Sequence, residues 1–179
     1  MAFATIDVTK GITGTLPTAN GGTGATSFSP GKVLQVQEFN YTTYAARTDN
    51  SSFSDALHVD ITPSASDSKI FITTAGQFSK SGVTEVIYRL YRQTGGSGDS
   101  GWTTAATRVG TDVGAWTGST SQANHTSGNV LWLDSPATTS ALRYVFAWTT
   151  YDNGVSAQIN NYNAGGSHAS QIIAMEIAA

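Results

Sequence analysis

The side chains with the clearest potential for covalent chemistry lie in residues 98–101, Gly-Asp-Ser-Gly. A serine acts as a nucleophile when a base and an orienting acid lie beside it, and His58 with Asp60 or Asp67 precedes Ser100 in the chain. However, the tetrapeptide lies in a run of glycine, serine and threonine, where short motifs often arise by chance, and a triad is defined by geometry. We therefore expect no catalytic residue and no enzymatic activity.

His58 and Asp60 could also contribute two ligands to a metal site, because alternate residues of a strand project from the same face. Two ligands do not complete a site, and nothing in the sequence brings His125 or His168 to them. A threefold axis could gather three copies of one histidine, and this alternative stays open. The glycine-rich residues 21–24 lack the Lys-Ser or Lys-Thr pair of a phosphate-binding loop. We expect neither a metal nor a cofactor.

The best candidates for binding are two tryptophans, Trp102 and Trp116, within residues 93–129, a long stretch rich in glycine, serine and threonine. Flat apolar rings beside amides and hydroxyls are typical of surfaces that bind a sugar ring or a protein, and loops often carry such sites. The polar residues of this predicted contact are Asp112, Gln122, Asn124 and His125. In the alternative interpretation, both rings hold the stretch against the rest of the molecule.

The elements that would position these residues are β-strands. From residue 31 onward apolar residues recur at every second position, as in residues 57–61, Leu-His-Val-Asp-Ile. The same period predicts about eight strands, near residues 34–37, 57–61, 70–72, 86–90, 130–133, 142–148, 155–159 and 171–177, with a further short strand within 105–109. No segment has a helical period with caps. The fold class predicted is all-β: an antiparallel, jelly-roll-like β-sandwich with almost no helix. Trp132 and Trp148 are expected in its core.

A turn signal lies at residues 151–155, Tyr-Asp-Asn-Gly-Val, where Asn-Gly separates two alternating runs. This pair readily adopts the positive φ angles that a two-residue type I′ turn requires. We therefore expect a β-hairpin between residues 142–148 and 155–159.

The last predicted strand has apolar side chains on both faces, because Ile172 and Ala174 alternate with Ile173, Met175 and Ile177. One sandwich core can use only one of these faces. The core does not require Ile172 and Ala174, so these two are the candidates for an oligomer interface. Irregular burial under loops is the alternative.

Composition excludes several classes of partner. Charged residues make up only 12% of the chain, against about 25% in an average soluble domain, and the net charge is −3 with the basic residues scattered. No nucleic acid is expected, because a phosphate backbone would meet no basic stripe. No membrane insertion is expected, since no uncharged apolar run approaches the roughly 20 residues of a membrane span. The absence of cysteine excludes disulfides and thiolate metal sites.

The N-terminal residues 1–29 differ from the rest. Residues 1–10 alternate apolar and polar types, whereas residues 12–27 contain too little apolar surface to build a core. Such a segment needs a partner, and we expect an extended arm that attaches the protein to another one. The residues predicted to make this attachment are Phe3, Ile6, Val8, Ile12, Leu16, Pro17, Asn20, Gly21, Gly22 and Gly24.

Within this arm, residues 15–24, Thr-Leu-Pro-Thr-Ala-Asn-Gly-Gly-Thr-Gly, resemble a signature that recurs in tail-fibre and related appendage proteins of bacteriophages, ahead of their β-rich parts. Four further short segments resemble the β-sandwich module of fibre-like phage proteins. They lie at residues 31–36, 57–64, 68–72 and 174–177. Residues 92–129 fall outside this pattern.

The resemblance implies a virion structural protein: a short trimeric fibre or fibre-tip subunit, assembled in the cytoplasm of a bacterial host and located in the virion. Residues 1–29 would be the attachment arm and residues 30–179 the trimerising β-sandwich. The implied partners are two further copies of the chain, another virion protein bound through the arm, and a glycan or protein of the host surface. Two alternatives remain, a head fibre or cement protein that decorates the capsid and a stand-alone carbohydrate-binding module.

Overall fold

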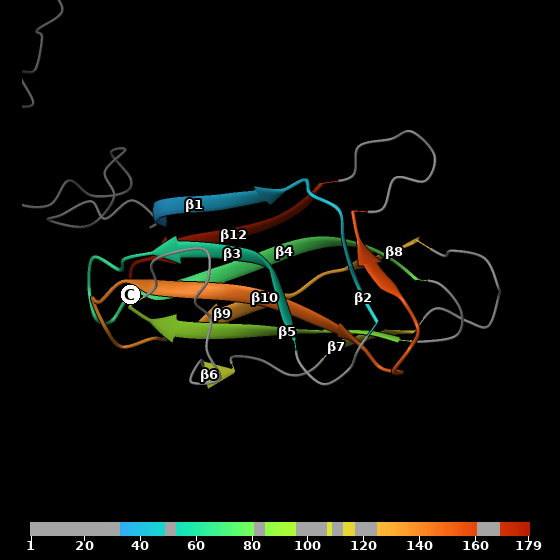
Figure 1. The fold of residues 1–179 in the computed structure, drawn as a ribbon. Coiled ribbons are helices and arrows are strands. Elements are labelled where there is room, and N and C mark those ends of the chain that lie inside the picture. The colour runs from blue at the N-terminus through green and yellow to red at the C-terminus, as the bar shows by residue number, and fades with distance from the viewer. Residues whose placement is uncertain are drawn as a thin grey trace, which may run out of the picture. The chain divides into compact units, whose positions relative to one another are not determined.

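Two antiparallel β-sheets face each other in the computed structural model (Figure 1), which describes residues 33–48, 53–80, 85–95, 107–108, 113–116, 125–160 and 169–179. The predicted arm and its boundary near residue 30 lie outside the described residues. None of the described residues is helical, so no helix there could cross a membrane. The strands are β1 (Val33–Tyr41), β2 (Ala45–Arg47), β3 (Ser54–Ile61), β4 (Lys69–Lys80), β5 (Glu85–Thr94), β6 (Thr107–Arg108), β7 (Val113–Trp116), β8 (His125–Gly128), β9 (Leu131–Asp134), β10 (Leu142–Thr150), β11 (Ala157–Ile159) and β12 (Ser170–Ile177).

The order of the strands is that of a jelly roll. The larger sheet contains the neighbours β1-β12-β4-β9, and the smaller sheet contains β3-β10-β5-β7. If these eight strands are counted along the chain, the sheets read 1-8-3-6 and 2-7-4-5, which is the double Greek-key arrangement of a jelly roll. The fold class predicted from the period-two pattern is therefore confirmed.

The long strand β4 organises the larger sheet. Its first half pairs with β12 on one side and β9 on the other, and its second half pairs with β11 and β8. Because β2 pairs with β11, the larger sheet extends past the end of β12. The two edges of its first half are β1 and β9.

The core lies between the inner faces of the two sheets, where the predicted alternation holds. The apolar residues expected to point inward from β3, the start of β4, and β5 are buried. An aromatic cluster of Phe78, Tyr88, Phe146 and Trp148 fills the centre, with ring centroids 5.2–6.0 Å apart. The larger buried core residues are Leu57, Val59, Ile61, Ile70, Ile72, Phe78, Val86, Tyr88, Leu90, Leu142, Tyr144, Phe146, Trp148, Ile159 and Ile172.

The prediction of a β-hairpin at Asn153-Gly154 is wrong, although the chain does turn there. Gly154 has a φ angle of 83°, and its N–H donates to the carbonyl oxygen of Thr48 at 2.7 Å. However, β10 pairs with β3 and β5, whereas β11 pairs with β2 and β4. The turn therefore carries the chain from one sheet to the other.

Candidate interaction surface

The two side chains considered as metal ligands, His58 and Asp60, take part in other contacts. The His58 ring stacks on the ring of Phe39 in β1, with centroids 4.9 Å apart and 16° between the planes. Both carboxylate oxygens of Asp60 accept hydrogen bonds at 2.7 Å from the guanidinium of Arg143. Among the described residues, no three side chains of metal-ligating type come together. The pair thus connects β3 to β1 and β10.

Of the six residues predicted to contact a partner, two lie in described strands. Trp116 ends β7 opposite Glu85, and His125 begins β8 opposite Ser79. The other four lie outside the described residues, namely Trp102, Asp112, Gln122 and Asn124. Three strands, β6 to β8, fall within residues 93–129, and β6 confirms the short strand predicted within residues 105–109. The contact itself stays a prediction.

The interface expected at Ile172 and Ala174 is corrected by the register of β12. Both side chains are 0% exposed within the single chain and belong to its core. They lie opposite Thr74 and Ile72 of β4, on the inner side of the sheet. The faces of β12 are therefore reversed relative to the sequence-based assignment. The partly exposed face carries Ile173, Met175 and Ile177.

That other side of β12 is part of an apolar surface that crosses four strands. The register aligns Val36 of β1, Met175 of β12, Phe71 of β4 and Leu133 of β9 in one row. A second row contains Glu38, Ile173, Thr73 and Leu131, and a third contains Val33, Ile177 and Lys69. We call these apolar residues the outer apolar face; its members are Val33, Val36, Phe71, Leu131, Leu133, Ile173, Met175 and Ile177. Their side chains are partly or largely exposed.

The end of this face at β9 contains its most exposed residue, Leu131. Leu131 is 70% and Leu133 49% exposed, and Trp132, on the opposite side of the strand, is 38% exposed. The expectation that Trp132 lies in the core is therefore wrong, because β9 pairs only with β4 among the described strands and leaves its other edge open. Exposed apolar edge strands without lysine or proline are templates for another chain.

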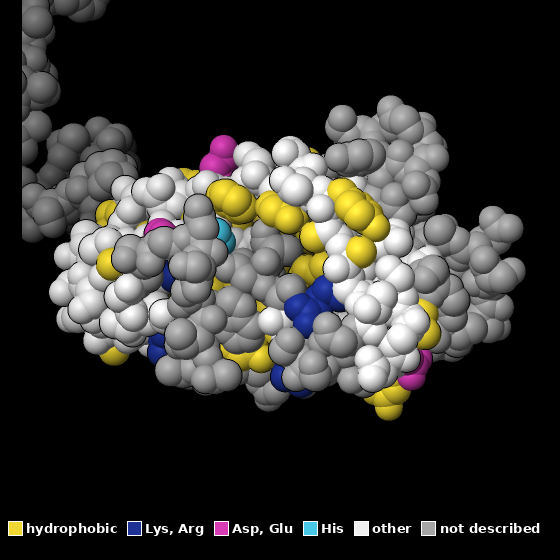
Figure 2. Space-filling view, viewed as in Figure 1, with side chains coloured by type: hydrophobic (Ala, Val, Ile, Leu, Met, Phe, Trp, Pro, Cys, Tyr) yellow, Lys and Arg dark blue, Asp and Glu magenta, His cyan; other side chains and the backbone are white. Residues whose placement is uncertain are grey.

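Among the described residues, the strands of the smaller sheet have no large exposed apolar side chain. Its central strand β10 is buried on both sides, including Val145 and Ala147 on the side away from the core. Arg89 of β5 lies over the ring of Phe53, with 4.2 Å from the guanidinium carbon to the ring centroid. In Figure 2, which shows this side of the molecule, Lys and Arg side chains and hydrophobic side chains are both visible between the residues that the structure does not describe. The large exposed apolar residues of the described strands thus lie on the larger sheet.

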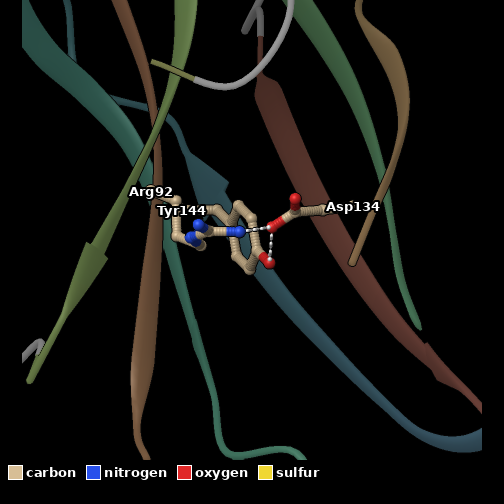
Figure 3. A network of polar contacts seen from close by, with 3 residues as sticks. All are labelled: Arg92, Asp134 and Tyr144. Atoms are coloured by element: carbon tan, nitrogen blue, oxygen red, sulfur yellow. Dashed lines mark hydrogen bonds and ion pairs between the residues drawn. The ribbon is translucent and has the colours of Figure 1, made fainter. Parts of the chain in front are cut away.

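A polar network holds β9 against the smaller sheet (Figure 3). The Asp134 carboxylate at the end of β9 accepts a hydrogen bond from the Tyr144 hydroxyl at 2.7 Å and forms an ion pair with Arg92 of β5. Burial, together with the hydrogen bond to Asp134, raises the pKa of Tyr144 far above its usual range. The tyrosine therefore stays protonated and donates. This contact between the sheets positions Leu131 and Leu133.

A second polar cluster holds the opposite edge. Glu176, on the inner side of β12, is fully buried and accepts hydrogen bonds at 2.7 Å from the Gln35 amide and from the Ser64 N–H and hydroxyl. Burial alone would raise the pKa of this carboxyl group, but hydrogen bonds from Gln35 and Ser64 lower it to about 2. The Gln35 amide also donates to the Thr62 carbonyl. The cluster thus ties β1 and β12 to the connection between β3 and β4.

Sequence reasoning missed most of the outer apolar face. The uncharged run Leu131-Trp132-Leu133 is a usable signal, because three successive apolar residues in a short strand put apolar side chains on both faces. Asp134, Arg92 and Glu176 carried no such signal, since Arg92 is distant from Asp134 in the sequence, and Gln35 and Ser64 are distant from Glu176.

No protein-family model and no curated protein matches the chain. Among solved structures, the chain is similar to a TNF protein, Eiger, from S. frugiperda, with 9% identity over 80% of this chain and 92% of that chain and a TM-score of 0.45. It is also similar to a structure of the Gx strain of infectious bursal disease virus, with 12% identity over 92% of this chain and 43% of that chain and a TM-score of 0.31. At these TM-scores the likenesses assign the chain to no family.

Proposed function

We propose that this chain is a structural protein of a bacteriophage virion without enzymatic activity, namely a short trimeric fibre or fibre-tip subunit. Residues 1–29 attach it to another virion protein, and the jelly roll projects from the particle. The resemblance of residues 15–24 to phage appendage proteins supports the location. A jelly roll with few charged residues is compatible with this role.

The structural observation that best supports the proposal is the outer apolar face. Monomeric soluble proteins rarely expose contiguous apolar patches of more than a few hundred Å². Here a row of four apolar side chains crosses an entire half-sheet, from Val36 to Leu133, and neither edge strand carries a lysine or a proline. Such a surface is expected to meet another protein chain, as in an assembled virion.

The proposed host contact lies at Trp102 and Trp116 with the neighbouring polar residues. Its partner would be a glycan or a protein of the host surface. Replacing either tryptophan with alanine is then expected to weaken adsorption to host cells while the thermal midpoint stays nearly unchanged.

Labelling of purified particles tests the proposed location. Antibodies to the full chain are expected to label one structure of the virion, and deletion of residues 1–29 is expected to abolish incorporation while circular dichroism still reports a β-protein. Particles without any label, prepared from cells that contain the protein, would contradict the proposal. A truncated protein that is still incorporated would contradict the role of the arm.

A further inference from the structure

The width of the outer apolar face allows it to meet two further copies of the same face. Four strands about 4.8 Å apart span about 14 Å, and the same spacing between β9 of one copy and β1 of the next gives a triangle with sides of about 24 Å, which places each sheet about 7 Å from the centre. Sheets that pack face to face are about 10 Å apart, which puts each about 5 Å from the plane between them. The long side chains of Met175 and Phe71, which lie side by side on the two middle strands, would fill the wider space at the centre.

The strand directions are compatible with the same arrangement. Each neighbouring pair in β1-β12-β4-β9 is antiparallel, so β9 runs opposite to β1. Rotation about an axis parallel to the strands preserves direction, and β9 of one copy would therefore meet β1 of the next in antiparallel orientation. Repeating this contact three times closes the ring, as a head-to-tail interface must if it is not to form a filament.

The order of apolar and polar rows along the strands is also compatible with three faces packed around one axis. The row from Val36 to Leu133 is apolar throughout and would form the middle layer. The exposed charge of Lys69 lies in the row on one side, and Gln171 lies beyond Glu38 on the other. Polar groups would thus lie toward the ends of the stack, where water can reach them.

We propose that three copies of this chain associate through the outer apolar face, with β9 of each copy beside β1 of the next and Met175 near the threefold axis. This inference rests on the proposed trimer and names its contact surface. The buried residues Ile172 and Ala174 have no part in it, because they lie on the inner side of β12.

Cysteine cross-linking of the full chain tests the contact between β9 and β1, because the chain has no cysteine of its own. A variant with both Val36→Cys and Leu133→Cys is expected to form covalent trimers under oxidising conditions and to return to single chains on reduction. A variant with Leu133→Cys and Tyr151→Cys is the control, since Tyr151 follows β10 at the opposite sheet. It is expected to give no covalent trimer.

Met175→Asp tests the face independently, because it would place three carboxylates near the axis. Its native mass is expected to fall to that of one chain at concentrations where the unchanged protein is trimeric, with the β-sheet circular dichroism retained. Ile87→Asp, on the smaller sheet, is the matched control and is expected to remain trimeric.

The outcomes separate this inference from the proposed function. An unchanged protein that is monomeric would overturn the trimer and the surface together. A trimeric protein in which Met175→Asp stays trimeric and Val36→Cys with Leu133→Cys gives no covalent trimer would overturn the surface alone, and the location in the virion would still stand on the labelling of particles.

Discussion

At the scale of single residues, Glu176 makes the stability of the fold depend on pH. Its pKa in the folded protein is lowered to about 2 from an ordinary value of 4.5, so the ionised carboxylate stabilises the fold above pH 4.5, and this contribution is lost as the pH falls toward 2. We expect the thermal midpoint to fall across this window. In Glu176→Gln the midpoint should be lower at neutral pH and should change less between pH 4.5 and 2, whereas the exposed control Asp67→Asn should follow the unchanged protein. Identical pH profiles for Glu176→Gln and the unchanged protein would show that the cluster does not titrate in this window.

Gly128 is required because its backbone lies close to two rings of the core. A Cβ atom at this position would lie 2.7 Å from ring carbons of both Phe78 and Tyr88. Gly128→Ala must therefore displace the aromatic cluster, and such overpacking typically costs about 1–3 kcal/mol. Chemical denaturation should show this loss of stability, and the exposed neighbour Ser127→Ala should show almost none. An unchanged midpoint for Gly128→Ala would mean that the rings can move aside freely.

At the scale of elements, the period-two pattern predicted the strands because each is half buried in a sandwich. It could not decide which face of β12 lies inside. Hydropathy favours Ile173, Met175 and Ile177, yet the inner face contains Glu176, whose burial depends on Gln35 and Ser64, far away in the sequence. The hydrogen bonds that allow Glu176 to lie on the inner face of β12 therefore come from residues that the local pattern does not include.

The same distinction explains the other errors. Asn153-Gly154 is a local turn signal, and a turn forms there, but whether two strands pair across it depends on which sheet each one joins. Trp132 is apolar and lies in a strand, but its exposure follows from the position of β9 at an edge. Local sequence reports the strand, and tertiary pairing decides burial.

The two faces of β12 make a matched test at adjacent positions. Ile172→Ala opens a cavity in the core and is expected to lower the free energy of unfolding by about 2–5 kcal/mol. Ile173→Ala removes apolar surface from the outer apolar face and is expected to raise the concentration at which the oligomer dissociates. Denaturation at high dilution and sedimentation across a dilution series measure the two effects. The opposite pattern would restore the faces as the sequence alone suggested.

At the scale of the whole molecule, the jelly roll divides its surface between two sheets of different character. The outer side of the smaller sheet has a buried centre with an ion pair between Arg143 and Asp60. The first half of the larger sheet instead exposes apolar side chains from β1 to β9. Both edges are held in place by polar clusters, through Asp134 at β9 and through Gln35 at β1. The trimer that we propose would cover this apolar surface.

The most direct test of this account is the native mass of the unchanged full chain in solution at micromolar concentration. We expect a single species of about 56 kDa, three chains of 18.7 kDa each. A species of 18.7 kDa that persists as the concentration is raised would contradict it, because the outer apolar face would then be exposed to water without a partner.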